Sequence, residues 1–437
     1  MIDTMIKQMP KYESYKESGI EWLGEIPSTW QLRRFKYLLD EVNERSDSGT
    51  EELLSVSQYT GVTRKSDKVQ SGELLTNAAS LEGYKMVRKG DLVSNIMLAW
   101  NGSLGVSPFN GITSPAYSVY RFESQCSEGY FHYLLRTGPY KAEFKRRSTG
   151  VIESRLRLYS DDFFDVVGML PSYDEQVAIA TFLDVKTSQI DEAIAIKQKQ
   201  IELLKEHKQI TIQKAVTQGL NPDAPMKDSG SDWIGEIPEH WDIGKAKYYS
   251  SVFVPERAKP NLNESSDGFP WVTTENLRSI SPTTSKSKYY VSFKDAQATG
   301  SRAVDKNSVL ATCVGTFGIA AINEESCIIN QQIQAYTRLN INTKYLLKLI
   351  ELSKDYFSIN ATMTTIAYVN RDIFADLPII IPPNSEQEEI AHYIDIKESQ
   401  IEQLIDLQKL QIDKLKEYKA TLINSAVTGK IKVTELV

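Results

Sequence analysis

The chain has 437 residues, 41% hydrophobic and 24% charged, so it is long enough for two to four ordinary globular domains. Its net charge of −7 argues against a broadly basic nucleic-acid surface, and its three scattered cysteines argue against a disulfide framework. It has neither a basic-then-apolar leader nor a run of about 18 apolar residues. We therefore expect a cytoplasmic protein without a membrane span.

The negative charge is unevenly distributed. Residues 31–170 contain 18 basic and 17 acidic side chains, whereas residues 219–241 contain one lysine and five acidic residues. This distribution permits DNA binding but does not by itself predict it.

A short N-terminal motif occurs twice in the chain. Residues 21–27 read EWLGEIP and residues 232–238 read DWIGEIP. The flanks align as well, because Trp22 and Trp30 correspond to Trp233 and Trp241 at one offset (233 − 22 = 241 − 30 = 211). The chain is therefore predicted to be a tandem duplication.

Each motif is followed by a block that differs between the two halves, 31–169 and 242–380. Apolar and polar residues alternate in strand-like runs between Gly, Asn and Ser. The predicted strands are 62–70, 90–100, 116–122, 308–322 and 333–339, with closing strands at 166–171 and 377–383. Short helices are predicted at 129–147 and 342–359. Both blocks are thus expected to be mixed α/β (α+β) domains.

A long helix is predicted to close each half. Asp174 and Ser385 are expected N-caps, with Glu175, Gln176, Glu386 and Gln387 in the first turns. Alternating steps of four and three residues from Ile190 to Ala215, and from Ile401 to Ala426, give the 3.5-residue period of a coiled coil. Gly219 and Gly429 are expected to end the helices. We expect an antiparallel pair, the alternative being two amphipathic helices each packed on its own domain.

The sequence shows no catalytic constellation. Phosphate-loop, dinucleotide-turn and Asn-Pro-Pro-aromatic motifs are missing, and the four histidines and three cysteines lack metal-ligand spacing. We therefore expect a binding protein without a metal, although an enzyme with an unrecognised site stays an alternative.

Candidate DNA contacts lie in segments that mix basic, amide, hydroxyl and aromatic side chains, since arginine suits guanine, amides suit adenine, and Lys, Ser and Thr suit phosphates. In the first block they are Tyr59, Thr63, Arg64, Lys65, Trp100, Asn101, Ser103, Lys145, Arg146 and Arg147. In the second they are Thr273, Thr274, Asn276, Arg278, Thr316, Asn330, Gln331, Gln332, Thr364 and Thr365. The consecutive amides 330–332 are the strongest candidates, because a strand has no other need for them. Gly315 and Gly318 are expected to shape a turn.

The whole pattern resembles the specificity subunits of type I restriction–modification systems. The resemblance rests on the repeated G-x-x-W-[LI]-G-E-I-P-x-x-W opener, the Pro-x-x-x-Glu-Gln link to each long helix, and the SAVTG ending at 425–429. It implies six segments: a conserved motif (1–30), target-recognition domain 1 (31–169), a central helix (170–218), a linker with the repeated motif (219–241), target-recognition domain 2 (242–380) and a distal helix (381–437).

The resemblance also implies what the chain does. Each recognition domain would read one half of an asymmetric split DNA sequence, and the antiparallel helices would set the gap between the half-sites. The chain itself would be non-catalytic and bind no cofactor. It would dock two methyltransferase subunits that use S-adenosylmethionine and, in the complete enzyme, two restriction subunits that use ATP and Mg. Partner-binding or structural roles would fall to Trp22, Trp30, Glu175, Gln176, Trp233, Trp241, Glu386 and Gln387.

Two further alternatives remain at this point. The chain could serve a related adenine-methylating defence system that has no ATP-driven nuclease, or it could be a scaffold that bridges two partners without binding DNA. The tryptophans of the repeated motif are expected to pack against the helices, not to stack on bases.

Overall fold

The computed structural model describes residues 6, 8–68, 80–152, 155–256, 258–264, 267–278, 287–363 and 365–436. Its contacts form two compact units. Unit 1 comprises Met1–Gln198 and Lys409–Val437, and unit 2 comprises Lys199–Gln408. Among the described residues, no helix combines the length and the apolar content needed to cross a bilayer.

Unit 1 is built around a four-stranded antiparallel sheet in the order β4-β11-β8-β9. Its strands are β1 (Tyr15–Glu17), β2 (Glu25–Pro27), β3 (Gln31–Arg34), β4 (Leu39–Val42), β5 (Leu54–Ser57), β6 (Gly61–Arg64), β7 (Lys85–Val87), β8 (Leu92–Asn95), β9 (Leu104–Val106), β10 (Gly111–Thr113), β11 (Tyr117–Phe122) and β12 (Val167–Leu170). Its helices are η1 (Phe35–Tyr37), η2 (Ser66–Lys68), η3 (Ala99–Asn101), α2 (Glu128–Leu134), α3 (Gly138–Arg147) and α4 (Ser160–Phe164). Aromatic side chains of α2, α3 and α4 fill the core.

Unit 2 repeats this arrangement with the sheet order β16-β22-β19-β20. Its strands are β13 (Met226–Asp228), β14 (Glu236–Pro238), β15 (Asp242–Lys245), β16 (Ser251–Phe253), β17 (Phe269–Val272), β18 (Tyr290–Val291), β19 (Val309–Thr312), β20 (Ala320–Ile322), β21 (Ile328–Ile329), β22 (Ile333–Thr337) and β23 (Pro378–Ile381). Its helices are η5 (Ala246–Tyr248), α6 (Thr274–Leu277), α7 (Phe293–Thr299), α8 (Thr343–Leu352), α9 (Lys354–Asn360) and α10 (Arg371–Ala375).

The duplication extends further into the blocks than the repeated motifs suggest. At the front, β1, β2 and β3 correspond to β13, β14 and β15 (226 − 15 = 236 − 25 = 242 − 31 = 211). At the back, α4 and β12 correspond to α10 and β23 at the same offset (371 − 160 = 378 − 167 = 211). Insertions and deletions are therefore confined to the middle of each block.

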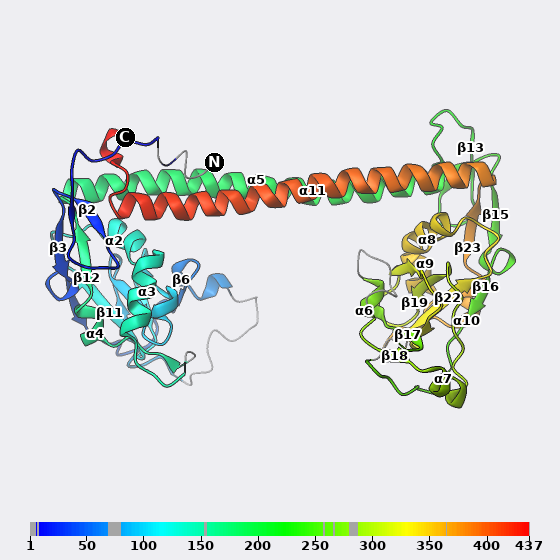
Figure 1. Cartoon of the computed structure of the whole chain (residues 1–437), viewed down its shortest axis with the longest axis horizontal. Coiled ribbons are helices and arrows are strands. Elements are labelled where there is room, and N and C mark those ends of the chain that lie inside the picture. The colour runs from blue at the N-terminus through cyan, green and yellow to red at the C-terminus, as the bar shows by residue number, and fades with distance from the viewer. Residues whose placement is uncertain are drawn as a thin grey trace. The chain divides into compact units, whose positions relative to one another are not determined.

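The two long helices are α5 (Tyr173–Gln218) and α11 (Asn384–Val427), which also begin 211 residues apart (384 − 173 = 211). They run side by side in opposite directions within each unit (Figure 1). In unit 1, Lys419 lies 2.7 Å from Asp191 of α5, and in unit 2 Lys208 lies 2.9 Å from Glu402 of α11. All sixteen predicted seam positions are buried or half-buried. The coiled-coil prediction is confirmed.

The structure corrects several local predictions. Both helices begin one residue before the expected N-caps, and the Ser172 hydroxyl accepts the first-turn N–H of Glu175. Gly219 has φ +76° directly after α5, as expected, and Gly429 has φ +74° two residues after α11. The segment 129–147 forms two helices, α2 and α3, and 342–359 forms α8 and α9.

Three of the predicted strands differ most from the structure. The first ends at Arg64 and continues into η2, with residues 69 and 70 outside the described part, and the second ends at Asn95 before η3. The run 308–322 forms the pair β19 and β20, because Gly315 (φ +80°) and Gly318 (φ +77°) turn the chain between them, as expected of these glycines.

Candidate nucleic-acid interface

A buried glutamine fastens each sheet domain to a long helix. In unit 1 the Gln176 Oε1 accepts the Ser127 N–H at the start of α2 (2.8 Å), and its Nε2 donates to the carbonyls of Gln125 and Pro171 (3.1 Å each). In unit 2 the Gln387 Oε1 accepts the N–H of Asn342 (2.8 Å), the residue that caps α8. Each glutamine thus satisfies a backbone donor that would otherwise lack a partner at a helix start.

The glutamate beside each glutamine binds a different partner in the two units. In unit 1, the Tyr12 hydroxyl donates to Glu175 at 2.5 Å. In unit 2, Trp241 Nε1 donates to Glu386 at 2.9 Å, and His240 Nε2 lies 2.8 Å from its other oxygen. Both carboxylates therefore hold the segment that precedes the sheet domain of their own unit.

A buried tyrosine fastens each sheet domain to the end of the other long helix. The Tyr130 hydroxyl of α2 donates to the Val427 carbonyl at 3.1 Å, and the Tyr345 hydroxyl of α8 donates to the Val216 carbonyl at 3.0 Å. Val216 and Val427 are repeat equivalents (427 − 216 = 211). Burial and neighbouring ionisable groups hold the pKa of both tyrosines well above the usual range, so both hydroxyls keep their protons.

The second tryptophan of each repeated motif packs against the end of a long helix, as expected. Trp30 and Trp241 are fully buried, and a Cβ added to Gly429 or Gly219 would come within 3.2 Å or 3.0 Å of the respective indole ring. Trp22 and Trp233 are half-buried. Trp22 packs edge-on against Tyr140 of α3, with ring centroids 5.0 Å apart.

In unit 1, Tyr59 is 81% exposed on the turn between β5 and β6. Arg136, in the turn directly after α2, donates to the carbonyls of Gln58 and Tyr59 at 3.0 and 2.7 Å, which fixes the hairpin turn. Thr63 and Arg64 lie on β6, where Thr63 meets Ser55 Oγ at 3.1 Å and Arg64 stacks over Phe109. Lys65, directly after β6, is half-buried. Sequence reasoning missed Arg136, because nothing distinguishes it from an ordinary helix-surface arginine.

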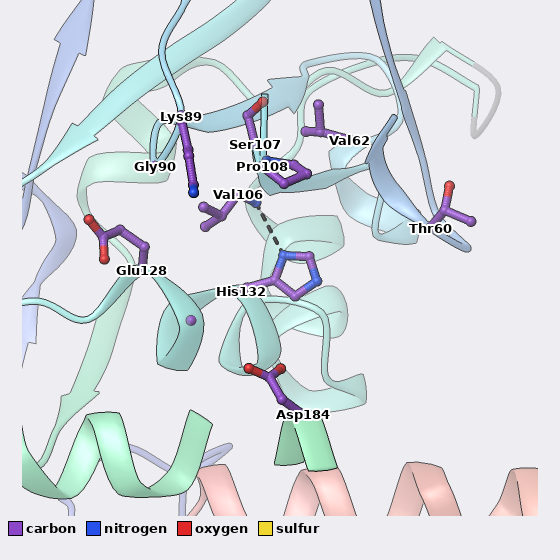
Figure 2. A pocket seen from close by; sticks show the side chains of 11 residues that line it. Thr60, Val62, Lys89, Gly90, Val106, Ser107, Pro108, Glu128, His132 and Asp184 are labelled. Atoms are coloured by element: carbon purple, nitrogen blue, oxygen red, sulfur yellow. Dashed lines mark hydrogen bonds between the residues drawn. The ribbon is translucent and has the colours of Figure 1, made fainter. Parts of the chain in front are cut away.

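Beneath the Tyr59 hairpin, His132 lines a cavity of about 630 Å³ (Figure 2). Its Nδ1 accepts the Val106 N–H at 3.2 Å, and Arg136 Nη1 lies 3.0 Å from Nε2. Burial, followed by the positive charge of Arg136, lowers the pKa of His132 to about 4. The imidazole is therefore neutral at neutral pH and acts as a packing element of this hairpin.

A second group of predicted residues meets where η3 packs against α3. Lys145 Nζ lies 5.4 Å from the Trp100 ring centre, and Asn101 accepts a hydrogen bond from the buried Ser103 hydroxyl at 3.1 Å. Arg146 and Arg147 share the buried carboxylate of Glu143 at 2.7 and 2.6 Å, and those bonds hold the pKa of Glu143 below its usual range although burial opposes this. Because Tyr59 and Gly102 line one cavity, this group neighbours the Tyr59 turn.

In unit 2, the predicted residues around α6 lie beside the predicted amides. Thr273 and Asn276 form the capping box of α6, Thr274 begins the helix, and Arg278 follows it, exposed. The Asn330 N–H donates to the Val272 carbonyl just before that cap at 3.0 Å.

The amides 330–332 form the turn between β21 and β22, so their expected place in a strand was wrong. Asn330 Oδ1 accepts the Gln332 N–H at 3.2 Å, and Gln331 Nε2 donates to the Glu256 carbonyl at 3.0 Å. Closing a turn is a use for these amides that the sequence alone did not suggest.

The remaining predicted residues of unit 2 share one neighbourhood. Thr316 is exposed on the turn between β19 and β20, and Thr365 is exposed on the next loop. The Gly315 N–H donates to the Ala367 carbonyl at 2.8 Å, which joins these two loops. Thr364 lies outside the described residues.

Comparisons with known proteins agree with this architecture. Residues 252–417 match the family model of the type I restriction modification DNA specificity domain. The type I restriction enzyme MjaVIII specificity subunit of Methanocaldococcus jannaschii is 23% identical, over 99% of both chains.

Two solved structures share the fold. A chain from a study of complex assembly and conformational transition in the type I R-M system matches with a TM-score of 0.70 at 15% identity, over 92% of this chain and 98% of that one. The HsdS subunit of Thermoanaerobacter tengcongensis matches with a TM-score of 0.57 at 16% identity, over 93% and 98%. With the duplicated domains and helices, these matches show that the chain has the fold of type I restriction–modification specificity subunits and that residues 252–417 match their DNA specificity domain.

Proposed function

We propose that this chain recognises an asymmetric, bipartite DNA site, with domain 31–169 reading one half and domain 242–380 the other. It docks two methyltransferase subunits and, in the complete enzyme, two restriction subunits. The chain itself is non-catalytic. S-adenosylmethionine, ATP and Mg bind to the partner subunits in this proposal.

The observation that supports the proposal is the duplicated attachment of the sheet domains. Each domain is hydrogen-bonded to the start of one long helix through Gln176 or Gln387, and to the end of the other through Tyr130 or Tyr345. Such fixed attachment suits a reader that must meet half-sites at one separation and rotational phase. The differing middles of the blocks suit two different half-sites.

The near balance of charge in residues 31–170 bears on affinity. Few uncompensated cations are available to displace counterions from DNA, so the partner subunits must supply much of the phosphate contact. We expect weak, salt-sensitive binding by the isolated chain and tight binding after complex formation. Full-strength binding without partner subunits would contradict this division of contacts.

The decisive experiment exchanges residues 31–169 for the corresponding block of a relative and sequences the methylated sites. One half-site should change while the other stays intact. A change in both halves, or in neither, would contradict modular recognition.

A further inference from the structure

Two loops occupy equivalent places in the two sheet domains. Loop A connects α3 to α4 through described residues 148–152 and 155–159, and loop B connects α9 to α10 through described residues 361–363 and 365–370. Each loop is closed by one antiparallel bridge, Thr149 with Arg157 and Thr362 with Tyr368. Arg157 and Tyr368 are also 211 residues apart (368 − 157 = 211), so the loops end at equivalent positions.

Both loops are anchored to the central sheet in the same way. The Leu158 N–H donates to the Ile96 carbonyl directly after β8 (2.8 Å), and the Val369 N–H donates to the Cys313 carbonyl directly after β19 (2.9 Å). Leu158 and Val369 are buried, so the base of each loop is fixed. Since β8 and β19 hold the same place in their sheets, the loops leave the two domains at corresponding points.

Both loops expose apolar side chains beyond their anchors. Val151 is 99% exposed and Ile152 51% in loop A, while Met363 is 77% exposed and Ile366 58% in loop B. Single exposed apolar residues are common on protein surfaces. Their recurrence in two loops of different sequence, at equivalent places, indicates a shared contact with another molecule.

The two loops differ in charge. In loop A, the exposed Arg155 and Arg157 line a cavity of about 550 Å³ together with Met97 and Tyr159. Residues 361–369, by contrast, read ATMTTIAYV and contain no charged side chain. In the DNA major groove, arginine pairs best with guanine O6 and N7, whereas apolar groups contact the methyl group of thymine.

We propose that loops A and B enter the major groove at the two half-sites. Loop A reads guanine through Arg155 and Arg157 beside an apolar tip, and loop B reads thymine methyl groups through Met363 and Ile366. This inference rests on the proposed function, and it assigns to recognition four side chains that sequence reasoning did not select.

The test uses the full-length chain assembled with its methyltransferase subunits and a duplex carrying the site found by methylation sequencing. Binding of this duplex is compared with that of two duplexes in which one half-site is scrambled. The loop A variant is Arg155→Gln/Arg157→Gln, and the loop B variant is Met363→Ser/Ile366→Ser. Met226→Ser, in β13 outside the sheet domains, serves as the matched control for removing an exposed apolar side chain.

We expect each loop variant to lose about tenfold or more of the discrimination at one half-site and to keep it at the other. The retained half-site shows that the variant is folded. A wild-type complex without preference for the methylated site would overturn both the proposed function and this inference. Wild-type discrimination that both loop variants retain would overturn the loop assignment alone. The loop assignment would also be overturned if the loop variants kept their DNA discrimination but no longer bound the methyltransferase subunit, because the loops would then contact protein and not DNA.

Discussion

The starts of the two long helices use equivalent residues in different ways. Gln176 and Gln387 both accept the N–H of the residue before the first helical turn of α2 or α8. Their neighbours Glu175 and Glu386 are also equivalent, yet one accepts from a tyrosine hydroxyl and the other from an indole N–H. The two halves therefore share the glutamine that binds a backbone N–H. They differ in the side chain that donates to the neighbouring glutamate.

This difference has a physical reason. A backbone N–H at a helix start is present whatever the sequence, so the glutamine keeps its acceptor role while the blocks diverge. A carboxylate accepts equally well from any donor within reach, so Tyr12 can replace Trp241 at little cost. As a result Trp30 Nε1 has no hydrogen-bond partner among the described residues, whereas Trp241 Nε1 has Glu386.

The largest predicted difference between the units is in how far low pH destabilises each of them. His132, in unit 1, is protonated below pH 6.5 in the unfolded chain but stays neutral to about pH 4 when folded. The stability that the neutral His132 side chain gives to folded unit 1 is thus fully present above pH 6.5. Up to about 3 kcal/mol of it is lost as the pH falls to 4. Hydrogen exchange should show α2 losing protection over this range before α8. Equal loss in both helices would contradict the assignment to His132.

Substituting the buried glutamines should destabilise the two units to a similar extent. Gln176→Ala and Gln387→Ala each leave a buried backbone N–H without an acceptor, so each should destabilise its own unit by about 2 kcal/mol. Chemical denaturation followed by exchange at α2 and α8 would assign each loss to a unit. A loss several times larger in one unit would show that the two attachments are not energetically equivalent.

Substituting the buried tryptophans should show how the two units differ in stability. Trp30→Phe and Trp241→Phe remove the same ring volume from fully buried sites, but only the second removes a hydrogen bond to a carboxylate. Trp241→Phe should therefore destabilise its unit by about 1.5 kcal/mol more than Trp30→Phe. Equal losses in thermal denaturation would mean that the Glu386 contact adds no net stability.

The smallest expected effect is that of Tyr12→Phe, about 1 kcal/mol near neutral pH. Burial, followed by the bond to Glu175, raises the pKa of Tyr12 above its ordinary value of 10.0. Its contribution is therefore present below pH 10 and declines as the pH rises above it. Above pH 10, the stability of unit 1 should therefore fall less steeply with rising pH in the variant than in the wild type. An equally steep fall in both proteins would count against this role for Tyr12.

Much of the fold could be predicted because it depends on periodicity. The constant offset identified the duplication, and the 3.5-residue steps from Ile190 to Ala215 identified a seam whose positions are all at least half-buried. The attachments made by Tyr130 and Arg136 could not be predicted, because their acceptors are carbonyls supplied by the tertiary fold. The place of residues 330–332 in a turn could not be predicted for the same reason, since that turn depends on how β21 meets β22.

The meeting of distant chain segments in unit 1 has a consequence for biosynthesis. The Tyr15 hydroxyl donates to the Gly429 carbonyl, and the Lys432 N–H donates to the Pro10 carbonyl at 2.7 Å, so this unit joins residues more than 400 positions apart. The ribosome has made all of unit 2 before it reaches the α11 residues that unit 1 requires. During translation, unit 2 can therefore fold first, whereas the sheet domain of unit 1 cannot complete its attachment until the last helix has been made.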